Sequence, residues 1–147
     1  MSPDDLAELH ALCFDFAPRP WSAGEFRSLL DSANVALLSV GGGFVLTQLL
    51  GDEAEILTIA VHPEHRRRGI AAGLLLRVHE NARESGINSV FLEVSERNTG
   101  AIGLYESLGY ERAGARKGYY RDRNGNRITA VVMKRDLTKG KAELLVK

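Results

Sequence analysis

Cysteine, an imbalance of charge and long apolar runs are all scarce in this 147-residue sequence. Cys13 is the only cysteine, so an intramolecular disulfide is excluded and a zinc site made of thiolates is not expected. Lys plus Arg and Asp plus Glu number 19 each, so no net positive charge favours nucleic acid or an anionic membrane as a partner. No apolar run approaches the roughly 20 residues that span a bilayer. Because the N-terminus also lacks a basic segment followed by an apolar core, we expect a cytoplasmic protein.

Two well-known phosphate-binding motifs are absent as well. There is no G-x-x-x-x-G-K-[ST], which excludes a P-loop, and no G-x-G-x-x-G after a predicted strand, which excludes a dinucleotide-binding fingerprint. His62 and His65 straddle Pro63 without further ligands at a suitable spacing, so we expect no metal site. What remains is an ordinary composition, 44% apolar and 26% charged, which is typical of one globular domain.

The first half of the chain carries two helix signals and then three strand signals. SPDD at residues 2–5 is typical of a helix start, and Ser22 with Glu25 forms a capping box before a second helix, where Trp21 can pack on Phe26. Strands are predicted over residues 35–40, 44–50 and 55–61. The last of these is apolar at nearly every position, which predicts that both of its faces are covered.

The second half begins with a strand–helix–strand unit. A helix that starts at about Gly69 follows the third strand, and SVFLEV at residues 89–94 makes the next apolar strand, so a right-handed crossover and a parallel pair are expected. Asn98 or Thr99 is positioned to cap a further helix, after which an antiparallel hairpin closes the pattern. The sequence therefore predicts a single α/β domain over residues 1–137 and a polar tail over residues 138–147.

Three consecutive arginines, Arg66, Arg67 and Arg68, stand directly before Gly69. A glycine between a strand and a helix lets backbone N–H groups approach a ligand closely, and a helix N-terminus attracts anions such as a pyrophosphate. Arginine side chains just upstream supply further donors to the same oxygens. The alternative is a solvated basic corner without a ligand.

Three motifs follow one another in the central and C-terminal parts of the chain. They are R-x-x-G-x-A at residues 66–71, FLEV at 91–94, and N-x-x-A-x-x-L-Y-E-S-L-G-Y at 98–110. In this order and spacing they resemble the motifs of the GNAT superfamily of N-acetyltransferases, and the resemblance covers roughly residues 55–137. It implies a mixed central sheet with a parallel pair of strands that splay apart, helices on both faces, and acetyl-CoA as the acetyl donor.

The same resemblance implies which residues bind acetyl-CoA. The arginine and glycine loop corresponds to the family's pyrophosphate loop. Backbone N–H groups of the preceding strand would bind pantetheine and polarise the acetyl carbonyl. Asn98 would contact the CoA arm, and a simple helix cap is the alternative for this residue. The implied acetyl-CoA-binding residues are Ile59, Ala60, Val61, Arg66, Arg67, Arg68, Gly69, Ile70, Ala71, Ala72 and Asn98.

The reaction needs a base, because an ammonium cannot attack a thioester. An N-terminal amine, with a pKa of about 7.7–8.0 against about 10.4 for lysine, needs less help from such a base. Glu93 is the candidate base, in an apolar strand where desolvation is expected, and a solvated glutamate at a strand end is the alternative. Tyr105 is the candidate acid for the departing thiolate, and a core aromatic is the alternative. The family resemblance favours the catalytic role for both.

Further residues narrow the resemblance. Pro20-Trp21-Ser22, LYESLGY at residues 104–110 and the pair Tyr119-Tyr120 are similar to segments of the RimI type, bacterial enzymes that acetylate the N-terminal alanine of a ribosomal protein. Arg19 and Arg121 depart from that pattern and bear on the peptide preference. The implied acceptor is a protein or peptide N-terminus. We expect a monomer or weak homodimer without a direct nucleic-acid or membrane partner.

Two other functions remain open at this point. One is acetylation of a small amine such as an amino acid, polyamine or antibiotic, and the other is a non-catalytic acyl-CoA-binding domain. Cys13 is not expected to relay the acetyl group, because it lies far in sequence from the cofactor elements. Asp52, Glu53 and Glu55 form an acidic stretch, for which a solvated turn is favoured over attraction of a basic peptide.

Overall fold

The computed structural model describes residues 1–15 and 18–138, so the predicted tail lies outside the described residues except for Thr138. The helices are α1 (Pro3–Cys13), α2 (Ala23–Leu30), α3 (Ile70–Glu84) and α4 (Thr99–Ser107), with one 3₁₀ turn at Pro63–His65. The strands are β1 (Val35–Val40), β2 (Gly43–Leu50), β3 (Glu53–Val61), β4 (Ser89–Ser95), β5 (Glu111–Arg121) and β6 (Arg127–Asp136). No helix in these ranges is long and apolar enough to cross a membrane.

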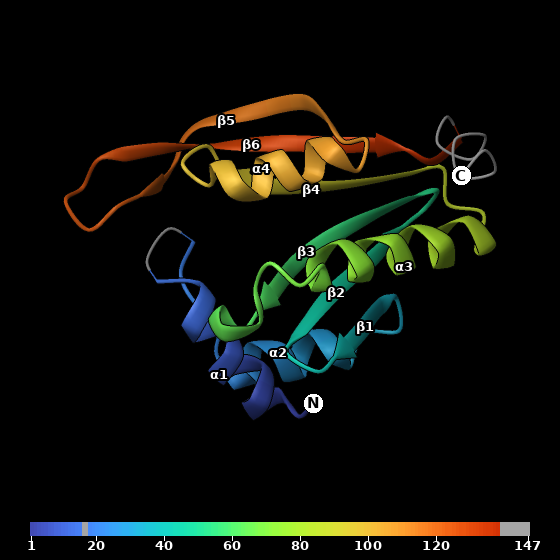
Figure 1. The fold of residues 1–147 in the computed structure, drawn as a ribbon, viewed down its shortest axis with the longest axis horizontal. Coiled ribbons are helices and arrows are strands. Elements are labelled where there is room, and N and C mark those ends of the chain that lie inside the picture. The colour runs from blue at the N-terminus through green and yellow to red at the C-terminus, as the bar shows by residue number, and fades with distance from the viewer. Residues whose placement is uncertain (16–17, 139–147) are drawn as a thin grey trace.

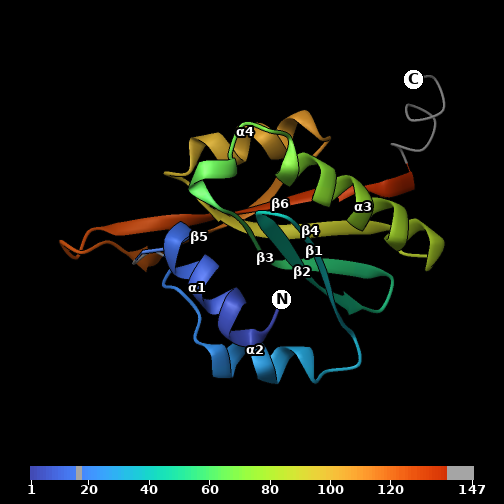
Figure 2. The same ribbon diagram turned by 60° about the horizontal axis from the view of Figure 1, so that its bottom comes forward.

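All six strands form one mixed sheet in the order β1-β2-β3-β4-β6-β5. Only β3 and β4 pair in parallel, as the crossover through α3 predicts. Helices α1 and α2 cover one face of the sheet, and α3 and α4 cover the other (Figures 1 and 2). The predicted α/β class, with helices on both faces of a mixed sheet, is confirmed.

Each face of the sheet has its own apolar core. Because strand side chains alternate between faces, neighbouring residues of β2 belong to different cores. The core under α3 and α4 includes Val45, Ile56, Leu74, Leu92, Ile102 and Met133. The core under α1 and α2 includes Leu6, Phe26, Phe44, Leu46 and Ala60.

The two N-terminal helices begin where local side-chain chemistry predicts. Ser2 and Asp5 form a capping box at α1, and Ser22 and Glu25 form another at α2. Each box satisfies two backbone N–H groups that have no partner within the helix. The rings of Trp21 and Phe26 lie 5.3 Å apart, which confirms the predicted hydrophobic contact.

A β-bulge in β3 opens the sheet. Leu46 of β2 pairs with Thr58, but the next residue pairs with Ile56, so Leu57 has no partner in the ladder. The parallel ladder to β4 covers only Glu53–Glu55, opposite Ser89–Phe91. Beyond it β3 and β4 diverge, as Figure 1 shows, which confirms the splayed pair. Both faces of β3 are covered, as predicted, because Ile56 and Ile59 pack with the core under α3 and α4, while Leu57 and Ala60 pack with the core under α1 and α2.

A buried histidine joins α1 to β3. His10 Nδ1 accepts a hydrogen bond from the Trp21 backbone N–H (3.0 Å), so Nε2 carries the proton and donates to the Thr58 hydroxyl at 2.9 Å. Burial lowers the pKa of His10 to about 4. Burial, together with the charges of Arg135 and Arg83, also lowers the pKa of His79 to about 3.

These two histidines predict a loss of stability in mild acid. Their pKa values are lower folded than unfolded (ordinary value 6.5), so the unfolded state binds protons first as the pH falls. The stabilisation is complete above pH 6.5, and between pH 6.5 and 5 we expect a loss of about 2 kcal/mol per histidine. Urea unfolding at successive pH values measures this slope. The variant His10→Phe should show about half the slope of the parent, and a flat profile in the parent would contradict the prediction.

Candidate active site

The loop between β3 and α3 has the backbone of an anion-binding site. Gly69 is the N-cap of α3, with φ +75°, and no side chain caps this helix. The first bond within the helix runs from Gly73 N–H to Gly69 C=O (2.9 Å). The N–H groups of Ile70, Ala71 and Ala72 therefore lack partners within the helix. Arg67, with φ +64°, also has left-handed backbone, which a side chain other than glycine rarely adopts.

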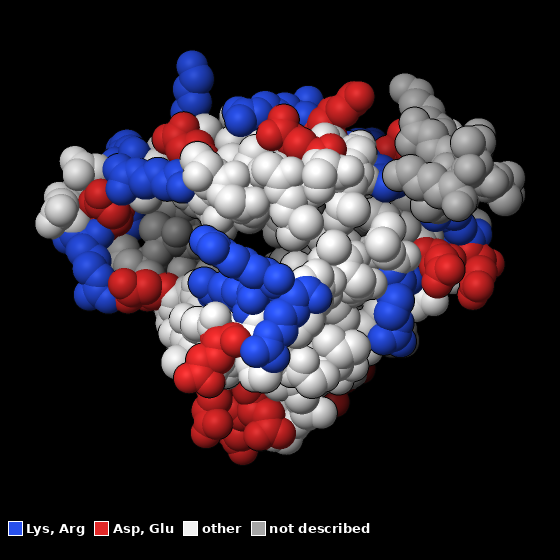
Figure 3. Space-filling model, viewed as in Figure 1, with Lys and Arg blue, Asp and Glu red and all other residues white. Residues whose placement is uncertain are grey.

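The three arginines surround this helix start, and all three are exposed. Figure 3 shows positively charged side chains gathered over the loop, beside a hollow. Arg66 Nε donates to the Val61 carbonyl (3.2 Å), so this side chain also ties the loop to the end of β3. The sequence pattern indicated only phosphate binding for Arg66 and gave no sign of this contact to the end of β3.

The end of β3 directs backbone donors into the opening of the sheet. His62 N–H bonds to Gly42 C=O at 2.7 Å. Bonded and non-bonded pairs alternate along an antiparallel ladder, so Ile59 and Val61 occupy non-bonded positions and their N–H groups point away from β2. On that side the ladder to β4 has already ended at Glu55. This strand end therefore lies next to the arginine loop, and among the described strands the N–H groups of Ile59 and Val61 have no partner in either ladder.

Glu93 lies on β4, and its side chain is 22% exposed. Arg116 Nε of β5 contacts its carboxylate at 2.9 Å. The expectation of an apolar environment for Glu93 is therefore wrong, because the edge strand β5 places the Arg116 guanidinium against its carboxylate. The pairing follows from the register, in which Glu93 opposes Val132, Arg116 opposes Ala130, and alternate residues share a face.

Tyr105 and Asn98 come from α4. Tyr105 is 6% exposed and packs near Tyr110, with ring centroids 5.8 Å apart. Burial raises the pKa of the Tyr105 phenol to about 12, so it keeps its proton at neutral pH. Tyr105 is a core residue as well as a potential proton donor. The Asn98 side chain accepts a hydrogen bond from Ala101 N–H (3.2 Å), which confirms that it caps the helix.

The fold also brings Cys13 and Glu55 to this region. The Cys13 thiol donates to the Val61 carbonyl at 3.2 Å, so its distance in sequence from the cofactor elements was misleading. Glu55 is half-buried on β3, which contradicts the favoured solvated turn. Burial raises the pKa of Glu55, and the negative charge of Glu93 adds to that rise. The sequence signal that could have predicted this burial is the position of Glu55 at the start of an otherwise apolar strand.

Tyr120 of β5 completes this side of the sheet. Its phenol is half-buried, and burial, the charge of Glu93 and neighbouring Tyr119 raise its pKa, while Arg116 opposes the rise. Tyr119 is 55% exposed. Its ring contacts Tyr120 edge-on, and the ring centre lies 5.1 Å from the guanidinium carbon of Arg116. Tyr119, Tyr120 and Arg116 of the edge strand β5 thus lie close to Glu93 of β4.

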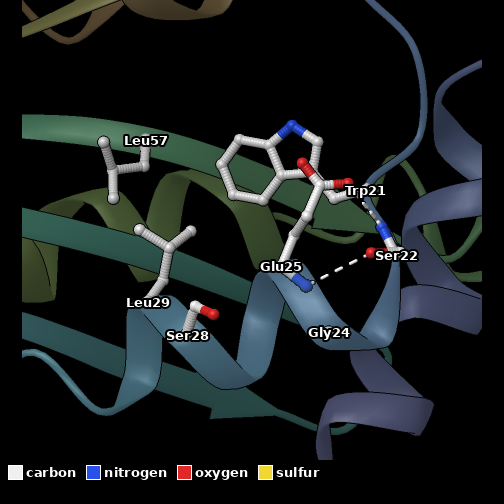
Figure 4. Close-up of a pocket in the computed structure, with 7 residues that line it drawn as sticks. All are labelled: Trp21, Ser22, Gly24, Glu25, Ser28, Leu29 and Leu57. Atoms are coloured by element: carbon white, nitrogen blue, oxygen red, sulfur yellow. Dashed lines mark hydrogen bonds between the residues drawn. The ribbon is translucent and has the colours of Figure 1, made fainter.

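An open depression of about 650 Å³ lies between α2 and β3. Figure 4 shows its apolar side chains, Trp21, Leu29 and Leu57, around the capping box of Ser22 and Glu25. Leu57 is the bulged residue of β3 and packs against the α1 and α2 core. The depression is therefore on the face of the sheet that α1 and α2 cover, and it does not include the arginine loop.

A known family matches most of this chain. The profile of the Acetyltransferase (GNAT) family matches residues 6–110. The chain therefore belongs to the GNAT acetyltransferase family. The predicted fold and enzyme class, an N-acetyltransferase, are confirmed. The family uses acetyl-CoA as its acetyl donor.

The similar proteins include acetyltransferases with named protein acceptors. The chain is 36% identical over 118 residues to the [Ribosomal protein bS18]-alanine N-acetyltransferase of Escherichia coli (strain K12), which covers 78% of this chain and 79% of that protein. The crystal structure of the ribosomal-protein-S18-alanine N-acetyltransferase from Escherichia coli superposes with a TM-score of 0.80 at 31% identity, over 89% of this chain and 84% of that one. Arabidopsis thaliana NAA60 in complex with acetyl-CoA shares the fold, with a TM-score of 0.78 at 19% identity, over 93% of this chain and 94% of that one. The predicted resemblance to the RimI type is confirmed.

Proposed function

We propose that this protein transfers the acetyl group of acetyl-CoA to the N-terminal α-amine of a protein, the N-terminal alanine of a ribosomal protein. The main structural support is the opening between β3 and β4. The N-terminus of α3 lies beside β3, and the Glu93 carboxylate is on β4. The relatives named above supply the acceptor class. We place the enzyme in the cytoplasm, where ribosomal proteins are made, as a monomer or weak homodimer.

In this proposal the donor binds along β3 and the start of α3. The unpaired N–H groups at residues 70–72 and the three arginines hold the pyrophosphate. Ile59, Ala60 and Val61 line the pantetheine arm, and the outward N–H groups among them polarise the acetyl carbonyl. Asn98 orders the start of α4 and contacts the CoA arm. No metal takes part.

The transfer then runs directly from thioester to amine. The ammonium gives one proton to Glu93, directly or through water, and the free amine attacks the carbonyl carbon. The N–H donors of β3 stabilise the tetrahedral oxyanion. The intermediate expels the CoA thiolate, which takes a proton from Tyr105. The second proton of the amine nitrogen restores the Tyr105 phenol, and Glu93 releases the first proton to solvent. The balance is one acetylated amine, one CoA thiol and one proton released.

Intact-mass measurement of peptides incubated with the enzyme and acetyl-CoA tests the proposal. We expect a gain of one acetyl group on a ribosomal peptide that begins with alanine, and none on the same peptide with a blocked N-terminus and a free lysine. Polyamines, amino acids and aminoglycosides serve as small-amine comparators. Faster acetylation of a small amine than of the alanine peptide would refute a protein acceptor, and failure to acetylate any amine would refute the enzyme assignment itself.

A further inference from the structure

We propose that Glu55 binds the ammonium group of the incoming acceptor, so that the acceptor site contains two carboxylates, Glu55 and Glu93, with different tasks. Glu55 holds and orients the cation, and Glu93 removes its proton. This inference rests on the proposed function, because it requires an amine acceptor, and it names a substrate-binding residue within the same site.

The position of Glu55 supports this role. It is the last residue of β3 paired with β4, opposite Phe91, where the two strands begin to separate. Buried residues alternate along both strands, so Glu55 and Glu93 point to the face opposite the α3 and α4 core. Glu93 is two positions beyond Phe91 and therefore shares that face. The two carboxylates thus lie on neighbouring strands at the mouth of the opening.

The charges around Glu55 are incomplete without a ligand. Among the described residues no hydrogen bond or ion pair reaches its carboxylate, although it is half-buried. Arg116 contacts Glu93, and its charge acts on Glu55 only from beyond contact distance. Two carboxylates and one guanidinium leave one negative charge unbalanced. An acceptor ammonium carries the one positive charge that this group lacks.

The electrostatics of Glu55 agree with a cation-binding role. Burial and the charge of Glu93 both raise the pKa of Glu55, while Arg116 lowers it. Tyr120 of β5 also faces Glu93. A bound cation would compensate both the desolvation of Glu55 and its repulsion by Glu93, because it attracts both carboxylates. It also provides a partner for Glu93 in place of Arg116, so the base can reach the substrate.

Glu53 provides a matched control on the same strand. It has the same side chain and points to the same face two residues earlier, but Lys134 contacts it at 2.7 Å and the Ser89 hydroxyl donates to it at 3.0 Å. Its charge is therefore already neutralised within the protein. If Glu55→Gln changes the kinetics and Glu53→Gln does not, the effect comes from the carboxylate of Glu55 and not from the general loss of a negative charge on β3.

Steady-state kinetics with an alanine-initiated peptide test the inference. For Glu55→Gln we expect the peptide KM to rise by about tenfold, while kcat and the KM for acetyl-CoA stay within about threefold of the parent. Glu53→Gln should match the parent in all three constants. An unchanged peptide KM in Glu55→Gln would overturn the inference. So would a large loss of kcat with an unchanged KM, because that result would give Glu55 a role in proton transfer.

A binding measurement separates this inference from the proposed function. Calorimetry in the presence of CoA compares the alanine peptide with a des-amino analogue, in which a propionyl group replaces the alanyl residue. The parent should bind the amine-bearing peptide about tenfold more tightly, and Glu55→Gln should lose this preference. Equal affinities in the parent would overturn the inference even if acetyl transfer is observed. If the parent acetylates no amine, the proposed function fails, and this binding comparison still decides the role of Glu55.

Discussion

Glu93→Gln is expected to lower kcat by on the order of 10²- to 10³-fold while leaving the KM for acetyl-CoA nearly unchanged. The substitution keeps the size of the side chain and removes its ability to accept a proton. The cofactor elements, the β3 end and the start of α3, are on the other side of the opening, so donor binding should not respond. Stopped assays that follow CoA release at a saturating peptide concentration and varied acetyl-CoA concentrations measure both constants.

Two further variants distinguish chemistry from structure at this position. Glu93→Asp keeps a carboxylate and should recover part of kcat. Glu96→Gln, just beyond β4, should retain the parent activity, because the amide oxygen can still accept the Thr129 N–H bond (3.1 Å). Loss of the ion pair to Arg116 should change stability by less than about 1 kcal/mol, since the arginine is 57% exposed. An unchanged kcat in Glu93→Gln across pH would refute the assignment of Glu93 as the base.

The pH profile of the reaction should be free of a basic limb from Tyr105. Its phenol stays protonated until the pH approaches about 12, because burial raises its pKa. The proton for the leaving thiolate is therefore available throughout the neutral range. The rate should rise with pH as the acceptor amine, whose pKa is near about 8, loses its proton.

Gly69→Glu is expected to weaken acetyl-CoA binding by more than about 100-fold. A Cβ at this position would meet no atom within 4 Å, so the effect is not a steric clash. Two other effects act together. The backbone at φ +75° costs an L-residue roughly 1–2 kcal/mol, and a carboxylate in front of α3 repels the pyrophosphate from the helix N-terminus. Calorimetric titration with CoA measures the loss.

Matched variants divide this effect into its parts. Gly69→Ala carries the backbone cost without the charge, and Arg67→Ala removes one arginine without changing the glycine. We expect each to weaken CoA binding by about three- to tenfold. A loss in Arg67→Ala equal to that in Gly69→Glu would mean that the guanidinium, rather than the backbone N–H groups, provides most of the phosphate affinity.

Local features of the chain were predictable from the sequence because neighbouring residues determine them. The capping boxes at Ser2 and Ser22 satisfy helix N–H groups three residues away, and Gly69 occupies the left-handed position before α3. The order of the arginine loop, FLEV and the Asn98 segment was sufficient to identify the GNAT resemblance. The roles of these residues in binding and catalysis remain predictions.

Contacts between distant strands could not be predicted in the same way. The bulge at Leu57 depends on the register between β2 and β3, and no short-range pattern marks it. The same bulge turns the backbone N–H groups of Ile59 and Val61 toward the opening between β3 and β4. Arg116 reaches Glu93 only because β5 joins the sheet beyond β6. An exposed cation of β5 therefore contacts β4, a strand that is mostly apolar in sequence.

The helix starts, the strand–helix–strand unit and the loop before α3 could be predicted from the sequence, because they depend on side chains within a few residues of one another. The tertiary structure alone decided which residues share the mouth of the opening. It brought Cys13 to Val61 and gave Glu93 a cationic partner, and it left Glu55 half-buried with no such contact from the described residues. The physical reason is that register and strand order set the distances between charges, and those distances are not encoded by spacing along the chain.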